Sequence, residues 1–346
     1  MAGAHLGAPD RAAMTGVASP HQTLTTNSTV ESPSPALVTI VIPVFNEEAV
    51  LPELLDRLAA MFDTQPDERW QALLVSDGSR DKSAALVEAR HRTDPRFQLI
   101  ELSRNFGFQS ALSAGLEAAQ RADAVVTMDA DLQDPPELIP EMVAAWRAGA
   151  EVVRAVRRGR AETGLRRLGF DLFHRLFAKL SDFPVEPNSG TFGLLNRDAV
   201  RAFCQLPERH RFFPGLRAWV GFERRDVFYE RQARAAGEAQ QTFGRLVRYG
   251  LDGVFSFSYL PLRLLTGLGL SIAGMGSVIG VFFAVRRILG VETAQTGFTT
   301  LVTLTLFLGG VQLVAIGVLG EYLGRIYDEV KQRPNFIVRR RVGLDD

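Results

Sequence analysis

Two aspartates with the spacing of a metal site stand in the stretch TMDADLQDPPE, which covers residues 127–137. One residue separates Asp129 from Asp131, and Gln133 follows in the same stagger. On an extended chain such residues point the same way, so the two carboxylates repel one another. A divalent cation removes that repulsion, and Mg²⁺ or Mn²⁺ typically takes one or two protein carboxylates together with phosphate oxygens. We interpret the stretch as a metal–phosphate site, against the alternative of a solvated acidic turn.

Three further polar stretches carry candidate ligands for a nucleotide. Asn46 and Glu47 lie where a helix is expected to start, so backbone N–H groups there can hold a base or a ribose, although Asn46 also fits a helix N-cap. Asp77 fits either a binding loop or a simple turn. Arg104 could pair with a phosphate or with a neighbouring carboxylate.

The elements that must position these residues alternate between strand and helix. Residues 37–46 form a nearly continuous apolar run, as expected of a strand buried on both faces, and residues 47–62 have apolar side chains at helical spacing. Such alternation with short connections predicts an α/β fold with a mostly parallel sheet covered by helices. Ligands of these sheets lie beyond the carboxyl ends of the strands. The remaining strands are predicted at 71–79, 97–105, 123–131 and 150–157, and the remaining helices at 82–92, 108–122 and 136–149.

Composition says little about partners. The chain has 346 residues, and its 39 basic and 39 acidic side chains balance, which gives no reason to expect nucleic acid as a partner. The single cysteine, Cys204, excludes a disulfide within the chain and fits a reducing compartment. Residues 1–35 are rich in Ala, Gly, Ser, Thr and Pro, and we expect a disordered tail there without the features of a signal peptide.

Two long apolar segments near the C-terminus predict membrane helices. Residues 264–285 and 299–320 contain no charged side chain, and each has about the 20 residues needed to cross a bilayer. The tail at 324–346 is more basic than the connection between the segments, so the positive-inside tendency puts the tail and the large N-terminal domain in the cytoplasm. Arg286 and Arg287 argue weakly the other way. We therefore expect a multi-pass protein of the cytoplasmic membrane, with an amphipathic juxtamembrane segment at 243–263 and two membrane helices within 264–323.

A basic cluster precedes these segments. It contains one acid, Glu162, whereas an ordinary solvated face usually has mixed signs. Its place between the α/β domain and the membrane segments favours an anionic lipid head group as its ligand over a solvated face. The cluster comprises Arg154, Arg157, Arg158, Arg160, Arg166 and Arg167, and the lipid-phosphate ligands we expect are Arg157, Arg158, Arg160 and Arg166.

The chain resembles the family 2 glycosyltransferases over about residues 38–333, and most specifically in its first half. The resemblance rests on VTIVIPVFNEE, VSDGSRDKS, LSRNFGFQSALSAGLEAA and MDADLQDPPELI, which look like the successive motifs of that family. The form DADLQDPPE, followed by a basic segment and two C-terminal spans, is similar to the polyprenyl-phosphate branch, which includes dolichol-phosphate mannose synthases and undecaprenyl-phosphate glucosyltransferases.

The resemblance implies a fold of the GT-A type (Rossmann-like) and an inverting transfer of a hexose from a nucleotide-diphosphate sugar to a polyprenyl phosphate, for cell-envelope glycans. It places Pro43, Phe45, Glu47 and Asp77 at the nucleotide base and ribose. Arg104 is a further candidate for binding the nucleotide sugar. The resemblance also suggests homo-oligomers. The metal and the donor diphosphate are expected at Asp129, Asp131 and Gln133.

The second half departs from the family pattern, which usually reads SGDFRLLDR where this chain reads SGTFGLLNR. Thr191 and Asn196 replace acids, and Gly193 replaces an arginine. A lipid phosphate is already anionic near neutral pH, because its second pKa is about 6, so the loss of an acid need not prevent its attack. The loss of cations near two phosphates matters more. Either the basic cluster compensates, or the donor differs, or the protein is a degenerate transferase that serves as a nucleotide-binding protein or scaffold. The other departures are Ser76, Pro214, Gln240 and Gln241.

Overall fold

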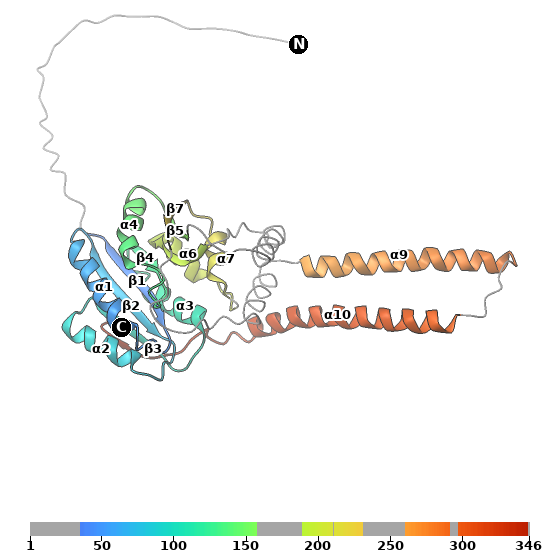
Figure 1. Cartoon of the computed structure of the whole chain (residues 1–346), viewed down its shortest axis with the longest axis horizontal. Helices are drawn as coiled ribbons and strands as arrows, with labels where there is room; N and C mark the ends of the chain where they lie inside the picture. The colour runs from blue at the N-terminus through green and yellow to red at the C-terminus, as the bar shows by residue number, and fades with distance from the viewer. Residues whose placement is uncertain (1–34, 158–188, 210, 231–259, 291–296, 345–346) are drawn as a thin grey trace, which may run out of the picture. The chain divides into compact units, whose positions relative to one another are not determined.

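The computed structural model describes residues 35–157, 189–209, 211–230, 260–290 and 297–344. Within these ranges, eight strands form one sheet in the order β7-β5-β6-β4-β1-β2-β3-β8, with helices on both faces (Figure 1). The strands are β1 (Leu37–Val44), β2 (Arg69–Ser76), β3 (Phe97–Leu102), β4 (Ala124–Thr127), β5 (Val152–Arg157), β6 (Ser189–Asn196), β7 (Arg224–Tyr229) and β8 (Val338–Val342). The helices are α1 (Leu51–Thr64), α2 (Ser83–Thr93), α3 (Phe108–Ala118), the short 3₁₀ turn η1 (Pro136–Leu138), α4 (Ile139–Arg147), α6 (Arg197–Gln205), α7 (Phe213–Trp219), α9 (Leu260–Ile288) and α10 (Phe298–Val330).

Six of the eight strands share one direction, which confirms the predicted mostly parallel α/β sheet. β1 pairs in parallel with β2 and β4, β2 with β3, and β5 with β7. β6 runs antiparallel to both β4 and β5, and β8 runs antiparallel to β3. The carboxyl ends of the six aligned strands therefore meet at one edge of the sheet, together with the amino ends of β6 and β8.

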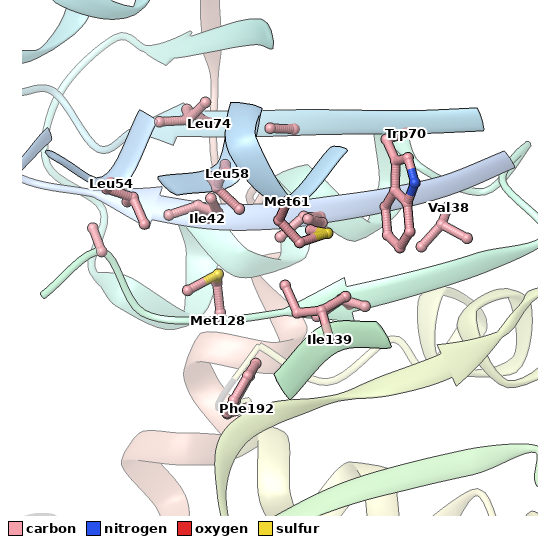
Figure 2. Packing of buried hydrophobic residues seen from close by; sticks show 14 of the residues in the cluster. Val38, Ile42, Leu54, Leu58, Met61, Trp70, Leu74, Met128, Ile139 and Phe192 are labelled. Atoms are coloured by element: carbon pink, nitrogen blue, oxygen red, sulfur yellow. The ribbon is translucent and has the colours of Figure 1, made fainter. Parts of the chain in front are cut away.

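The sheet is buried on both faces, as the apolar run of its central strand predicted. On one face, Val38 and Ile42 of β1 lie under α1, whose Leu54, Leu58 and Met61 recur at helical spacing (Figure 2). α2 and α4 cover the same face, while α3, α6 and α7 cover the other. Each fully buried leucine contributes roughly 1.5–3 kcal/mol to folding, so these two apolar layers hold the functional edge in place.

One strand of this sheet comes from the far end of the chain. β8 lies after the last apolar helix, and its Arg340 bonds Glu101 of β3 at 2.7 Å and Glu88 of α2 at 2.9 Å. The backbone N–H of Ser103 donates to Ile337 O at 2.9 Å, next to the first residues of β8. The predicted basic tail therefore contains an edge strand, which the sequence did not suggest because three consecutive arginines hide its alternation.

The C-terminal helices α9 and α10 cover the two apolar segments expected at 264–285 and 299–320. Within the part of the chain that the structure describes, one stretch, Phe307–Val330, is long and apolar enough to cross a membrane, and Leu264–Ile279 is a shorter apolar helix. Large apolar side chains along both helices are exposed, among them Leu270, Leu313 and Ile316. These facts identify one candidate membrane helix, and the two-helix hairpin stays a prediction. Residues 1–34 of the tail predicted at 1–35, and most of the juxtamembrane segment, lie outside the described residues.

Candidate active site

The loops that follow β1 and β2 are joined by hydrogen bonds. Asn46 adopts a left-handed backbone conformation with φ 55°, and its Oδ1 accepts the N–H of Arg80 at 2.9 Å. The N–H of Glu47 donates to Ser83 Oγ at 2.9 Å. α1 starts only at Leu51, so Asn46 does not cap it. The two loops instead form one connected rim at the carboxyl edge of the sheet.

Asp77 clamps the loop after β3. Its carboxylate is buried and accepts the N–H groups of Phe106 at 2.7 Å and Gly107 at 2.9 Å. Burial raises the pKa of Asp77, although these two bonds and the charge of Arg104 oppose the shift. The neighbouring Gly78 has φ +65°, and a Cβ there would lie 2.4 Å from the carbonyl carbon of Arg104, so only glycine permits this approach.

A small cavity opens between these loops. Its volume is about 160 Å³, below the roughly 300–1,000 Å³ of whole-ligand pockets, so it suits a flat ring rather than an entire nucleotide sugar. Phe45 and Phe108 expose 45% and 39% of their surface beside it, which leaves their rings available for stacking. The lining residues are Pro43, Val44, Phe45, Asp77, Asn105, Gly107, Phe108 and Ala111.

The cavity brings together three of the predicted nucleotide ligands, Pro43, Phe45 and Asp77. Sequence reasoning did not place Asn105 or Phe108 at this cavity. Phe108 is also the first residue of an amphipathic helix, which accounts for its apolar side chain without any ligand. The guanidinium of Arg104 lies 3.9 Å from the centre of the Phe106 ring, and its Nη1 donates to Asn105 O. Arg104 itself does not line the cavity, but it contacts Asn105, which does.

The two aspartates of the predicted metal site follow β4 at the same edge. Asp129 Oδ1 accepts the hydroxyl of Thr191 at 3.2 Å, and Asp131 Oδ1 accepts the N–H of Gln133 at 3.2 Å. The chain turns at Leu132, which has φ 58°, so residues 131–133 do not continue the extended stagger. The structure therefore brings Asp129, Asp131 and Gln133 together around a turn.

The carboxylates around Asp129 repel its negative charge. Burial raises the pKa of Asp129 to about 7, and the charges of Asp134 and Asp131 add to the shift, while Thr191 and Arg157 oppose it. A divalent cation would relieve this repulsion. Among the described residues no group of three or more His, Cys, Asp or Glu side chains is arranged to hold a metal. The residues present thus fit an ion that takes two carboxylates and completes its shell with phosphate oxygens or water.

The basic cluster splits into two environments where the structure describes it. Arg154 is buried in a bidentate pair with Asp226, with bonds of 2.8 and 2.9 Å. Arg157, the last residue of β5, bonds Tyr229 and lies at the site edge beside Asp134. The other expected lipid-phosphate ligands, Arg158, Arg160 and Arg166, lie outside the described residues.

Two of the departures from the family pattern have structural reasons. Asn196 caps α6, its Oδ1 accepting Ala199 N–H at 2.8 Å, and asparagine caps as well as the acid it replaces. A Cβ at Gly193 would lie 2.6 Å from Val153 O and 3.0 Å from Nη1 of the buried Arg217. The missing arginine side chain at 193 therefore leaves room for another arginine that comes from α7.

Pro214 lies in the first turn of α7, where proline is well tolerated. Ser76 ends β2, and its Oγ accepts the N–H of Ser79 at 3.4 Å. Gln240 and Gln241 lie outside the described residues.

The fold and site together define an α/β protein with a small cavity and two neighbouring aspartates at one sheet edge. Residues 39–203 match the family model "Glycosyl transferase family 2". An uncharacterized glycosyltransferase from Synechocystis sp. is 42% identical over 89% of this chain and 96% of its own length. A prophage bactoprenol glucosyl transferase homolog from Escherichia coli is 38% identical over 88% of this chain and 98% of its own. The chain belongs to the family 2 glycosyltransferases.

A solved structure shows a more distant similarity. It is glucosyl-3-phosphoglycerate synthase from Mycobacterium tuberculosis, in complex with Mn²⁺, uridine diphosphate and glucosyl-3-phosphoglycerate. It is 18% identical, has a TM-score of 0.42, and the match covers 64% of this chain and 78% of that one.

Proposed function

We propose that this protein transfers a hexose from a nucleotide-diphosphate sugar to a polyprenyl phosphate, with inversion at the sugar, at the cytoplasmic face of a membrane. The observation that carries the proposal is the meeting of a ring-sized cavity and the Asp129–Asp131 pair at one sheet edge. Several relatives are named bactoprenol glucosyl transferases, which supports the lipid acceptor. We propose that the product serves cell-envelope glycans.

The donor half of the site supports the binding of a nucleotide-diphosphate sugar. Pro43, Phe45 and Phe108 offer apolar surface to the base, and Glu47 borders the same rim. Asp129, Asp131 and Gln133 would hold Mg²⁺ or Mn²⁺, which would neutralise the donor diphosphate as it leaves. The chain's own contribution is to hold these carboxylates at a fixed place, with Thr191 donating to Asp129.

The acceptor half supports a phosphate nucleophile. A phosphate monoester carries its negative charge near neutral pH, since its second pKa is about 6, so the chain need not supply a strong base. Positive charge is needed instead, to bring this anion close to the donor diphosphate. We assign that role to Arg157, together with Arg158, Arg160 and Arg166 from the same basic cluster.

The path of the chain supports a membrane hairpin. β8 follows α10 along the chain, yet it pairs with β3 of the same sheet that carries the donor site. The sheet and β8 must therefore lie on one side of any membrane, so the chain between them crosses an even number of times. If α10 spans, α9 must span too. We propose a transferase domain at 36–242 that β8 completes, a juxtamembrane segment at 243–263, two spans within 264–323, and a cytoplasmic tail at 324–346.

The alternative, a degenerate transferase acting as a scaffold, loses part of its motivation. It rested on the cluster of departures around Thr191, Pro214 and Gln240. Pro214 lies in the first turn of a helix, where proline is tolerated. Of the neighbouring departures, Asn196 keeps a cap and Gly193 makes room for Arg217. The scaffold hypothesis still predicts metal-dependent nucleotide binding without any transfer.

The direct test is transfer of radiolabelled sugar from nucleotide donors to undecaprenyl phosphate in membranes that contain the protein. Thermal shift with Mn²⁺ would first select the donor that binds. We expect transfer that stops with EDTA and returns with Mn²⁺ or Mg²⁺. Asp131→Ala should abolish it, whereas Asp63→Asn, which changes an exposed acid on α1, should not. Activity that persists in Asp131→Ala would rule out the metal role.

A further inference from the structure

A chain of hydrogen bonds holds one arginine at the carboxyl edge of the sheet. Arg157 ends β5 and Tyr229 ends β7, and the two residues are partners in the parallel register of these strands. Arg157 Nε donates to the Tyr229 hydroxyl at 3.0 Å, and that hydroxyl donates to Oδ1 of Asp134. We propose that Tyr229, oriented by Asp134, is a positioning residue that aims the Arg157 guanidinium at the phosphate of the lipid acceptor.

The direction of these hydrogen bonds follows from the chemistry of the three side chains. An arginine side chain only donates, an ionised carboxylate only accepts, and a phenol can do both. Burial and the neighbouring carboxylate raise the pKa of Tyr229, so the phenol keeps its proton and can donate a hydrogen bond to Asp134. Its remaining lone pairs then face Arg157. Asp134 is itself 1% exposed, which leaves this acceptor little freedom to move.

The guanidinium lies beside the metal carboxylates. A Cβ at Gly190 would lie 3.2 Å from Arg157 Nη2, so the start of β6 passes directly against the guanidinium. The next residue on β6, Thr191, donates to Asp129. One strand, β6, thus lies between Arg157 and Asp129 and contacts both through Gly190 and Thr191. A phosphate bound by Arg157 would therefore lie next to the donor diphosphate.

A second arginine on the same strand shows what a purely structural pair looks like. Arg154 and Asp226 are also register partners on β5 and β7, but they form two bonds of 2.8 and 2.9 Å and the arginine side chain is 8% exposed. Arg157 instead gives its Nε to a neutral phenol, keeps its Nη2 3.6 Å from Asp134, and is 21% exposed. Its charge is less neutralised and more accessible, as a phosphate ligand requires.

This inference rests on the proposed function, so the experiment includes a binding measurement that needs no turnover. Full-length protein in detergent is titrated calorimetrically with farnesyl phosphate, and separately with nucleoside diphosphate plus Mn²⁺. We compare Tyr229→Phe and Arg157→Lys with Asp226→Asn, which disturbs the buried pair on the same two strands. Tyr229→Phe keeps the ring, which packs edge-on against Phe192 with 5.8 Å between the ring centroids.

We expect Tyr229→Phe and Arg157→Lys each to weaken farnesyl phosphate binding by about tenfold, the usual effect of losing a hydrogen bond to a charged group. Their double variant should lose little more, because both changes remove one interaction. Nucleotide binding should stay within about twofold of the wild type, and Asp226→Asn should not change farnesyl phosphate binding. In transfer assays the loss should fall on the KM for undecaprenyl phosphate.

Several results would overturn the inference. Among the variants, these are unchanged farnesyl phosphate binding in Arg157→Lys, equal losses of nucleotide and lipid binding in Tyr229→Phe, and additive losses in the double variant. A wild-type protein that binds farnesyl phosphate no more tightly than farnesol would also overturn it. If Tyr229→Phe fails to fold, Arg157→Lys decides alone. Tyr229-dependent phosphate binding in a protein that transfers no sugar would keep this inference and reject the proposed function.

Discussion

The hydroxyl of Thr191 on β6 donates to the carboxylate of Asp129, in the loop after the neighbouring strand β4, at 3.2 Å. Thr191 is also held by its own backbone, because its carbonyl accepts the hydroxyl of Thr127 at 2.5 Å. A neutral residue therefore stands where the family usually has an acid. It supplies a hydrogen bond to Asp129 of the predicted metal site without adding another negative charge.

Replacing Thr191 with valine should weaken nucleotide binding that depends on Mn²⁺. The change keeps the shape of the side chain but removes a bond to a charged acceptor, which is worth about 1.5–3 kcal/mol, so we expect at least a tenfold rise in Kd by calorimetry. Thr191→Ser keeps the hydroxyl and should bind as the wild type does. Equal losses in both variants would show that packing matters there, rather than the hydrogen bond.

Phe108 should contribute to nucleotide binding by stacking on the base. Base–aromatic stacking is worth about 1–3 kcal/mol, so Phe108→Leu should weaken binding of the nucleoside diphosphate by about tenfold and leave the dependence on Mn²⁺ unchanged. Titration of the variant with the diphosphate, with and without Mn²⁺, checks both parts. Phe222 is also aromatic, is partly buried against the core and does not line the cavity, so Phe222→Leu should not affect nucleotide affinity. A wild-type Kd in Phe108→Leu would show that the cavity does not hold the base.

The sequence alone predicted which strand-end loops meet at this edge. The motifs at 43–48, 76–81 and 127–137 follow strands whose direction is set by short connections, so their meeting at one edge follows from topology. Asp77 lines the cavity, yet its bonds to Phe106 and Gly107 depend on a glycine conformation that no apolar pattern reveals.

The C-terminal half was harder to predict. The partners Arg157 and Tyr229 are 72 residues apart, and β7 is a short strand whose alternation is weak. β8 is hidden in a basic run. These pairings are nonlocal, so local propensity carries little information about them.

Gly78 should be intolerant of any side chain. Its φ of +65° costs an alanine about 1–2 kcal/mol, and the added Cβ would also meet backbone atoms of Arg104 and Asn105 at 2.4–2.8 Å. Gly78→Ala should therefore lower thermal stability and displace the loop that lines the cavity. Gly149 has φ +101° with nothing within 4 Å of its added Cβ, so Gly149→Ala measures the cost of the backbone conformation without a steric clash. The two variants should differ clearly in melting temperature, and similar values would mean that the loop yields.

Removing residues 335–346 should affect the site through the edge of the sheet. The deletion leaves β3 with an unpaired edge and frees Ser103, whose N–H donates to Ile337 O just before the cavity-lining loop. We expect a lower melting temperature, more aggregation and weaker nucleotide binding. Arg340→Ala alone breaks exposed ion pairs, which are worth about 0–1 kcal/mol, and should have little effect on any of these measurements.

The pairing of β8 with β3 also predicts a membrane topology that can be measured. The native Cys204 is first replaced by serine, and single cysteines are then placed at residue 293, between α9 and α10, or at residue 346, after β8. In intact cells, an impermeant maleimide should label the cysteine at 293 and leave the one at 346 unlabelled until the membrane is permeabilised. A cysteine at residue 56 on α1 is the control for the side on which the sheet lies. Labelling of 346 without labelling of 56 would place β8 and the sheet on opposite sides, which the hydrogen-bonded register of β3 and β8 forbids.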